Sequence, residues 1–269
     1  MIGPALLFCP ANRPDRFEKA LRAADSVILD LEDAVAPEEK AEARAAVAAS
    51  HLDPRRVIVR VNPVDSEDHE RDVAVLRRTP YRTVMLAKTE SPSECDTLHA
   101  LGCRVVALCE TPRGVRNAWT IAEHPAVTAL MWGAEDLVAG LGGRSSRRAN
   151  GDYREVARFA RAQVLIAARA AGRTAIDAVH LDISDLDGLE SEAEDAAASG
   201  FAATACIHPT HVAVIRAAYS PSLKEIAWAQ SVLAAEEFSA GVFRLDGRMI
   251  DEPILRQARA IMERREMLP

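Results

Sequence analysis

Short runs of strand-forming residues recur along most of the chain, and helical stretches lie between most of them. The runs are nearly continuous in apolar residues, which is typical of parallel strands in a sheet covered by helices. Eight such runs fit a closed (β/α)8 barrel better than an open doubly wound sheet, and no GxGxxG motif follows the first run. The runs cover residues 5–9, 26–33, 57–62, 83–88, 104–110, 128–136, 174–179 and 203–209.

The pattern changes after Pro221. The sequence predicts a helix over 222–238, a glycine-punctuated hairpin over 240–251 and a final amphipathic helix over 252–267. A tail of this size is too small for a core of its own, so we expect it to pack on the barrel or on another subunit. The predicted organisation is a catalytic barrel over residues 1–220 and a lid or oligomerisation extension over residues 221–269.

Composition excludes several classes of partner. The formal net charge is −7, which disfavours nucleic acid, and no apolar stretch is long enough to span a membrane. The five cysteines are odd in number and show no CxxC spacing, so neither a disulfide framework nor a structural zinc site is expected. We expect a cytoplasmic protein that acts on small molecules.

Charged residues collect where the predicted strands end. The run SVILDLED ends in three carboxylates within four positions, although its other side chains look buried. In a (β/α)8 barrel the carboxyl ends of all strands meet at one mouth, where active sites lie. Both signs of charge therefore converge there, from Glu32, Asp33, Arg60, Asn62, Lys88, Glu110, Asp136 and His208.

Structural roles compete with functional ones for several of these residues. Asp30 lies earlier on its strand and is expected to pair with Lys88 or Arg60 inside the barrel. Glu32 is equally compatible with structure and function, His208 is not expected to be a ligand, and nothing around Lys88 supports a Schiff base.

The pair Glu110 and Asp136 gives a stronger signal. Two carboxylates at the ends of adjacent strands, with no His or Cys ligand nearby, suit a hard cation with oxygen ligands, so Mg²⁺ fits better than zinc. The alternative is that such acids cap neighbouring helices. Spacing alone leaves both readings open.

An ordered set of short motifs resembles the citrate lyase beta-subunit-like proteins of the HpcH/HpaI aldolase/citrate lyase family. They run from the first strand to the tail: LFCPANRPDRFEKA, VILDLEDAVAPEEKAEAR, VRVN, VMLAK, CET, MWGAEDL, AIDAVH, CIHP and GRMIDEP. The resemblance implies a (β/α)8 barrel of the phosphoenolpyruvate/pyruvate-binding type. One departure is Ala87, where the family usually has proline, and it leaves Lys88 in register.

The resemblance also implies a metal site and its surroundings. Glu110 and Asp136 would be the protein ligands of Mg²⁺, and Asp33 would hold a metal-bound water. Glu32 would support the site, and Arg60 would clamp the carboxylate of an oxaloacetate-, pyruvate- or acetoacetate-like fragment.

Other implied roles lie around the substrate. Arg16 and Lys88 would line the mouth, and backbone N–H groups at Ala134 and Glu135 would hold the keto acid. Asp251 would reach the active site of a neighbouring subunit and handle the proton on the thioester carbon, which implies a homotrimer or a hexamer.

These residues suit a magnesium-dependent carbon–carbon lyase of the EC 4.1.3 type. Its substrate would be a 3-hydroxyacyl-CoA such as citramalyl-, malyl- or hydroxymethylglutaryl-CoA, and Mg²⁺ would be the sole cofactor. Two alternatives are the citryl-thioester lyase subunit of a larger complex and a non-catalytic keto-acid-binding protein. The thioester carrier is CoA or an acyl-carrier protein. Arg144, Arg147 and Arg148 in the loop 140–151 would either contact CoA phosphates or belong to a solvated surface loop.

Overall fold

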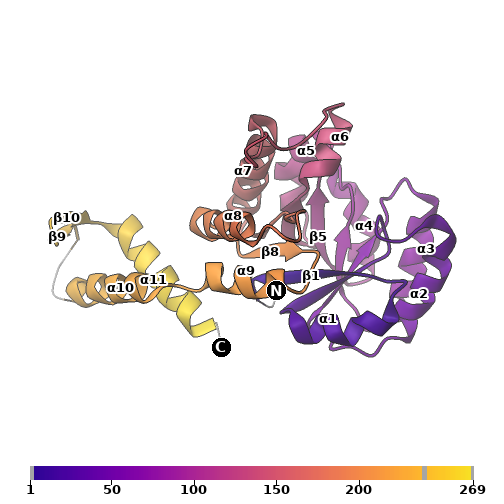
Figure 1. The fold of residues 1–269 in the computed structure, drawn as a ribbon, viewed down its shortest axis with the longest axis horizontal. Coiled ribbons are helices and arrows are strands. Elements are labelled where there is room, and N and C mark those ends of the chain that lie inside the picture. Colours follow the sequence, from indigo (N-terminus) through magenta and orange to yellow (C-terminus); the bar gives the residue numbers. More distant parts are fainter. Residues whose placement is uncertain (1–2, 238–240, 268–269) are drawn as a thin grey trace. The chain divides into compact units, whose positions relative to one another are not determined.

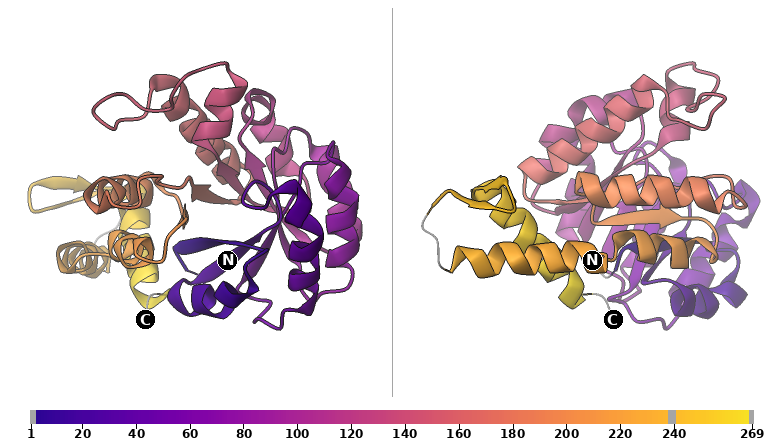
Figure 2. Two further views of the ribbon diagram at one scale, coloured as in Figure 1. Left: turned by 45° about the vertical axis from the view of Figure 1, so that its right-hand side comes forward. Right: turned by 60° about the vertical axis from the view of Figure 1, so that its left-hand side comes forward.

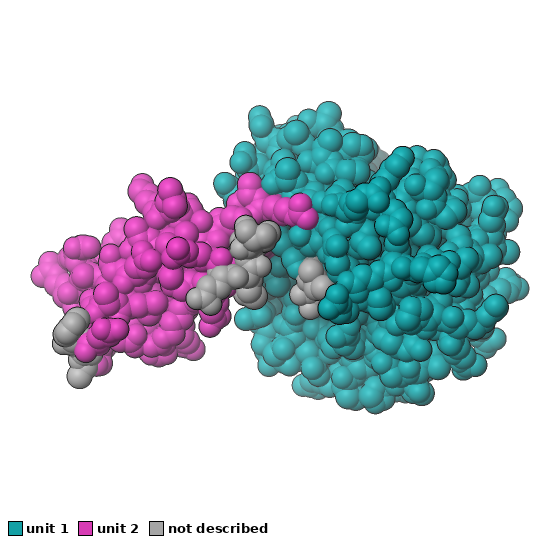
Figure 3. Space-filling view, turned by 90° about the horizontal axis from the view of Figure 1, so that it is seen from below, with its two compact units in different colours: residues 1–215 teal, residues 216–269 magenta. Residues whose placement is uncertain are grey.

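The computed structural model describes residues 3–237 and 241–267. The chain forms two compact units, Met1–Ile215 and Arg216–Pro269, shown in teal and magenta in Figure 3. The division falls within helix α9 (His211–Tyr219), a few residues before the expected boundary at 220/221. The catalytic and lid roles of the two regions stay predictions.

The first unit is a closed barrel of eight parallel strands, in which each strand pairs with the next and β1 pairs with β8 (Figures 1 and 2). This confirms the predicted (β/α)8 fold. The strands are β1 Ala5–Pro10, β2 Ser26–Asp30, β3 Val57–Val61, β4 Thr83–Leu86, β5 Arg104–Cys109, β6 Val127–Trp132, β7 Thr174–Asp177 and β8 Ala203–Cys206.

Helices follow the strands and lie outside the ring (Figure 2). Proline opens several of them, where its missing N–H costs nothing, and Thr111 accepts the Gly114 N–H at the start of α5. The helices are η1 Pro14–Arg16, α1 Phe17–Ala23, η2 Pro37–Glu39, α2 Lys40–Ala49, α3 Glu67–Leu76, η3 Pro92–Cys95, α4 Asp96–Ala100, α5 Pro112–Glu123, α6 Ala134–Gly140, α7 Glu155–Ala170 and α8 Leu186–Ser199.

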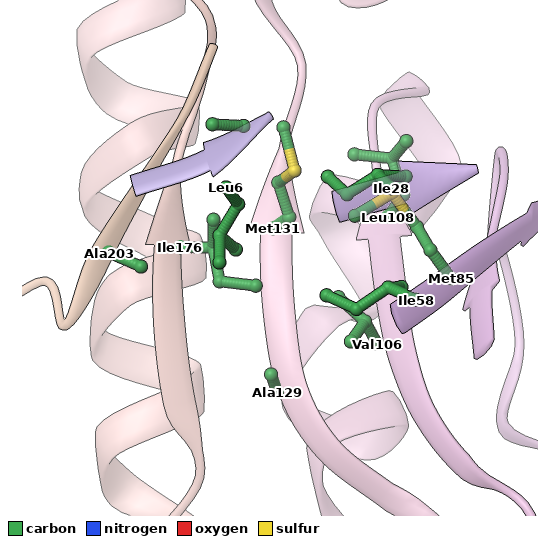
Figure 4. Close-up of a cluster of buried hydrophobic side chains, with 11 residues drawn as sticks. Leu6, Ile28, Ile58, Met85, Val106, Leu108, Ala129, Met131, Ile176 and Ala203 are labelled. Carbon is green, nitrogen blue, oxygen red and sulfur yellow. The ribbon is translucent and has the colours of Figure 1, made fainter. Parts of the chain in front are cut away.

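Apolar side chains fill the interior of the barrel, so that the barrel is a packed core and not a pore (Figure 4). Burying this set in the interior leaves the strand ends as the place where polar groups gather. The interior cluster consists of Leu6, Ile28, Ile58, Met85, Val106, Leu108, Ala129, Met131, Ile176, Ala203 and Ala205.

Several predicted strand ends are wrong, because the strands stop two to four residues earlier, as in the second, fourth, sixth, seventh and eighth. The second and sixth strands end at Asp30 and Trp132, before the acids that follow them, and α6 begins at Ala134. At the start of α7, Asn150 and Asp152 are of residue types that commonly cap helices, but neither caps this one. These two side chains hydrogen-bond to each other at 2.7 Å, and Arg154 takes the N-cap position without a side-chain cap. Gly172 follows the end of this helix with φ +68°, as a helix stop requires.

The second unit contains α10 (Leu223–Glu236), the hairpin strands β9 (Phe243–Leu245) and β10 (Arg248–Ile250), and α11 (Glu252–Met267). It has a small core of its own, which corrects the expectation that it has none. Packing of α10 on α11, with the hairpin beside them, buries Ala229, Val232, Ile250, Leu255 and Ala258. The predicted helix end at Phe238 lies outside the described residues. Among the described helices, none has the length and apolar character that crossing a membrane requires.

Candidate active site

A cavity of about 250 Å³ opens at the carboxyl ends of the barrel strands. Predicted residues that line it are Asp33, Arg60, Glu110, Ala134, Glu135 and Asp136. Sequence reasoning missed its apolar wall, although each member lies in a strand or just after one. The wall consists of Phe8, Leu108, Met131, Trp132, Ala178, Val179 and Ile207.

Arg60 and Asp30 form a buried, two-bond ion pair across β2 and β3. Their backbones are register partners, and the distances are 2.7 Å from Nε to Oδ1 and 2.6 Å from Nη2 to Oδ2. The remaining Nη1 lies 2.9 Å from Glu32. Asp30 therefore has the structural role expected for it. Asp30 holds one edge of the Arg60 guanidinium and Glu32 contacts its Nη1, so a substrate carboxylate would have to share Nη1 with Glu32.

Lys88 links several acids at the mouth. It follows β4 with φ +49°, a left-handed conformation that is uncommon for a residue other than glycine. Its ammonium contacts Glu32 and lies 3.1 Å from Asp33 and 3.4 Å from Asp136. Partial burial opposes its charge, but hydrogen bonding to Glu32 outweighs this and raises the pKa of Lys88. An ammonium that stays protonated is a poor Schiff-base nucleophile, so the structure gives that role no support.

Glu110 is the most deeply placed of the predicted metal ligands and is only 3% exposed. It follows β5, and its Oε1 accepts the backbone N–H of Lys88 at 3.1 Å. Burial, reinforced by the charges of Asp136 and Glu32, raises the pKa of Glu110 to about 8. A carboxyl group that is both desolvated and repelled by neighbouring acids is stabilised in its charged form by a cation.

Glu110 and Asp136 fit a divalent cation of the magnesium type. Asp136 lies in the first turn of α6 with its side chain 37% exposed, so that it is open to solvent, whereas Glu110 is buried. Within residues 3–237 and 241–267, no group of three or more His, Cys, Asp or Glu side chains could hold a metal. Two carboxylates and solvent access suit Mg²⁺, which keeps several waters, better than zinc, which takes three or four protein ligands.

Glu32 and Asp33 differ in environment although they are adjacent. Burial raises the pKa of Glu32 despite the opposing charges of Arg60 and Lys88. The Asp33 side chain is 60% exposed; partial desolvation works against its charge, but the Lys88 ammonium prevails and lowers the pKa of Asp33. Asp33 thus offers an ionised carboxylate at the rim, and Glu32 is held inside by the two cations.

The structure does not bring every predicted residue to this cavity. Arg16 ends η1, is exposed, and is not part of the cavity lining. Asp251 lies in the second unit at the start of α11, where its Oδ1 accepts the Ile254 N–H at 3.4 Å. It is therefore placed as the N-cap of that helix. The roles of these two residues in substrate binding and proton transfer stay predictions, as do the metal- and substrate-binding roles of the residues at the mouth.

A second cavity of about 710 Å³ adjoins the first and shares Glu135 and Leu181 with it. The loop 140–151 borders it. Arg147 pairs with Glu192 and stacks on the ring of Tyr153, at 3.9 Å from the ring centroid. Arg148 pairs with Glu155, whereas Arg144 is exposed. Two of the three loop arginines are thus engaged within the chain, which weakens the case for phosphate contact.

A (β/α)8 barrel with two carboxylates for a divalent cation and two basic side chains at one mouth defines a metal-assisted enzyme acting on a small anion. The sequence model of one family, HpcH/HpaI aldolase/citrate lyase, matches residues 5–209. The chain belongs to this family, as its motifs predicted.

Relatives of known name or structure cover nearly the whole chain. A citrate lyase subunit beta-like protein of Mycobacterium tuberculosis is 52% identical over 97% of this chain and 95% of its own length. Human mitochondrial citramalyl-CoA lyase is 32% identical over 94% of this chain and 83% of its own length. A crystal structure of CitE from Mycobacterium tuberculosis with magnesium, acetoacetate and coenzyme A superposes with a TM-score of 0.95, at 51% identity and 98% coverage of both chains.

Proposed function

We propose that this chain is a magnesium-dependent carbon–carbon lyase. It cleaves, or in reverse forms, a 3-hydroxyacyl-CoA thioester such as citramalyl-, malyl- or hydroxymethylglutaryl-CoA, giving a keto acid and an acyl-CoA. The observation that carries the proposal is the buried Glu110 beside Asp136, in a mouth that also presents Arg60 and Lys88. The named relatives support the same class, since they include a citramalyl-CoA lyase and a CitE structure with magnesium and coenzyme A.

Glu110 and Asp136 would hold the Mg²⁺, with Asp33 at the rim beside them. When bound, Mg²⁺ supplies a Lewis acid for the hydroxyl oxygen that becomes the keto oxygen. Gly133 and the Lys88 backbone N–H fix the Glu110 carboxylate, and the first turn of α6 carries Asp136. The chain thus sets the two carboxylates before substrate arrives, which preorganises the site.

Arg60 and Lys88 provide the positive charge that a keto-acid carboxylate requires. Asp30 holds the Nε–Nη2 edge of Arg60, which leaves the guanidinium with a fixed orientation in the cavity wall. Glu32 bridges Arg60 and Lys88 and keeps both cations at the mouth. Ala134 and Glu135 line the same cavity at the first turn of α6, where backbone N–H groups have no helical partner.

The reaction needs one more group, because a carbon must gain a proton. Cleavage breaks the bond between the carbinol carbon and the carbon next to the thioester. The hydroxyl proton passes to solvent water, and the electron pair of the broken bond delocalises into the thioester carbonyl. Asp251 would then protonate that carbon as a general acid, or remove its proton in the synthetic direction. This assignment requires a homotrimer or hexamer in which Asp251 of one copy reaches the barrel of another. The proposed location is the cytoplasm.

A panel of hydroxyacyl-CoA thioesters, assayed for keto-acid release with Mg²⁺, tests the proposal. We expect at least one of the three named thioesters to release its keto acid and the matching acyl-CoA in equal amounts. Release of the intact hydroxy acid with free CoA would identify a thioesterase instead. If no thioester is consumed while pyruvate or oxaloacetate still binds with Mg²⁺, the chain is a keto-acid-binding protein. Turnover only of an acyl-carrier-protein thioester would identify a citrate lyase subunit.

A further inference from the structure

Lys88 contacts both sides of the candidate metal site. Its backbone N–H donates to Oε1 of Glu110, at 3.1 Å, and its ammonium lies 3.4 Å from Oδ1 of Asp136. Both proposed metal ligands therefore touch one residue, through different parts of it. The left-handed backbone, with φ +49°, allows the N–H and the side chain to reach the two carboxylates together.

The other cation of the mouth is committed elsewhere. Arg60 is held by two bonds to Asp30 and one contact to Glu32. In the described part of the chain, Lys88 is the one basic side chain within ion-pair distance of Asp136. Its ammonium also contacts Glu32 and Asp33, so it can leave Asp136 and still keep two anionic partners.

The Lys88 side chain is accessible enough to move. It is 29% exposed, whereas the Arg60 side chain is 11% exposed. A lysine ammonium is a point charge on a flexible stem, and it holds a carboxylate without the directional fork that locks arginine in place. The contact with Asp136 is also the longest of its three.

We propose that Lys88 is an internal counter-ion that competes with the divalent cation for Asp136. It is a positioning residue. Its ammonium offsets the negative charge of the carboxylates in the free protein and breaks its contact with Asp136 when Mg²⁺ binds. After that exchange the ammonium stays on Glu32 and Asp33. The inference rests on the proposed function, since it takes Glu110 and Asp136 as the Mg²⁺ ligands.

If the ammonium competes with Mg²⁺, removing it should lower the Kd for Mg²⁺, which removal of a purely structural lysine would not do. Removing the ammonium deletes a positive charge next to the incoming cation and leaves the carboxylates with less compensation. Mg²⁺ should then bind the free protein more tightly, on the order of tenfold, because charges at such distances interact strongly in a partly buried site. The gain should shrink as salt is added, since the lysine is partly exposed.

Calorimetric titration of Mg²⁺ into the free protein tests this, with three variants beside the wild type. Lys88→Met keeps the stem and the strained backbone but loses the charge, and Lys88→Gly loses the charge and relieves the strain. Lys19→Met removes an exposed lysine on α1 as a charge-matched control. We expect both Lys88 variants to lower the Kd for Mg²⁺ and Lys19→Met to leave it unchanged. Circular dichroism verifies folding, and the pair of Lys88 variants keeps the test usable if one of them misfolds.

Other outcomes would overturn the inference. An unchanged or higher Kd in a folded Lys88→Met would show that the ammonium does not compete for Asp136. Tightening in Lys88→Gly alone would assign the effect to the backbone. In both cases the wild type still binds Mg²⁺ and the proposed function stands. A wild type that binds no Mg²⁺ would instead refute the proposed function and this inference with it.

Discussion

At the scale of single residues, the position of Glu110 depends on Gly133. A Cβ atom added at Gly133 would lie 2.7 Å from Oε2 of Glu110 and 2.8 Å from its Cβ, both well inside van der Waals contact. Nothing larger than glycine fits between the sixth strand and this carboxylate. The glycine in MWGAEDL therefore leaves the space that the Glu110 carboxylate occupies, next to the proposed metal site.

Gly133→Ala should fold and yet lose Mg²⁺ binding, because Glu110 has to move away from the added methyl group. We expect kcat/KM to fall at least about tenfold, which corresponds to roughly 1.4 kcal/mol of transition-state stabilisation. Gly140→Ala is the control at the other end of α6, since its Cβ would meet only the Pro112 ring at 3.0 Å. Equal kinetics for Gly133→Ala and wild type would show that Glu110 has room to adjust.

The charged residues of the mouth were predictable from the sequence, but their pairing was predictable only in part. The acids and bases at strand ends stood out because buried strands rarely end in charge. That Asp30 takes an edge of the Arg60 guanidinium depends on the register of β2 against β3, which the apolar runs do not specify. The left-handed conformation of Lys88 gave no signal either, because nothing in VMLAK calls for it.

At the scale of elements, the barrel strands were predicted and some of their ends were not. The run TALMWGAED reads as one apolar segment, but the strand stops at Trp132 and a helix starts at Ala134. Periodicity cannot divide a short apolar run between a strand and the helix that follows. The site depends on this division, because it places Asp136 on a helical turn and not on the strand.

The start of α11 allows the two possible roles of Asp251 to be separated. Its side chain accepts a backbone N–H as a helix cap, so replacement by alanine would remove the cap along with the carboxylate. Asp251→Ser keeps a capping oxygen but has no acidic proton. We expect this variant to fold with wild-type Tm and bind Mg²⁺ normally, yet to lose about 10²–10⁴-fold in kcat, the usual scale of general acid–base catalysis.

A loss of activity in Asp251→Ser that is matched by a loss of Tm would point to the helix cap instead. The control is Ser222→Asp at the start of α10, which exchanges one capping residue for another at a position with no proposed chemical role. It should keep both Tm and kcat.

At the scale of the whole molecule, the eightfold alternation of strand and helix was enough to predict the barrel, since few folds use so many parallel strands in so few residues. The core of the second unit was not predicted from the sequence. Its core of small and medium side chains forms only when α10, α11 and the hairpin come together, so the sequence of any one segment does not predict it. Chain length alone was a poor guide to whether a tail can bury a core.

Mixed oligomers test whether two copies share one site. At a Mg²⁺ concentration too low for Asp136→Asn, the Asp251→Ser and Asp136→Asn chains should each be nearly inactive. Co-assembly should create sites with a wild-type metal centre from one copy and a wild-type aspartate from another. Activity should then reappear from two inactive parents. Verified mixed oligomers that stay inactive would place Asp251 within its own chain or outside the chemistry.

The most direct test of the central claim is the Mg²⁺ dependence of keto-acid release by wild type and Asp136→Asn. Chelation should abolish wild-type activity and added Mg²⁺ should restore it. The variant should fold but need at least about tenfold more Mg²⁺ for half-maximal rate, because one of two protein carboxylates on the cation is lost. Keto-acid release that survives chelation, or the same Mg²⁺ dependence in both proteins, would contradict the assignment of Glu110 and Asp136 as the catalytic metal site.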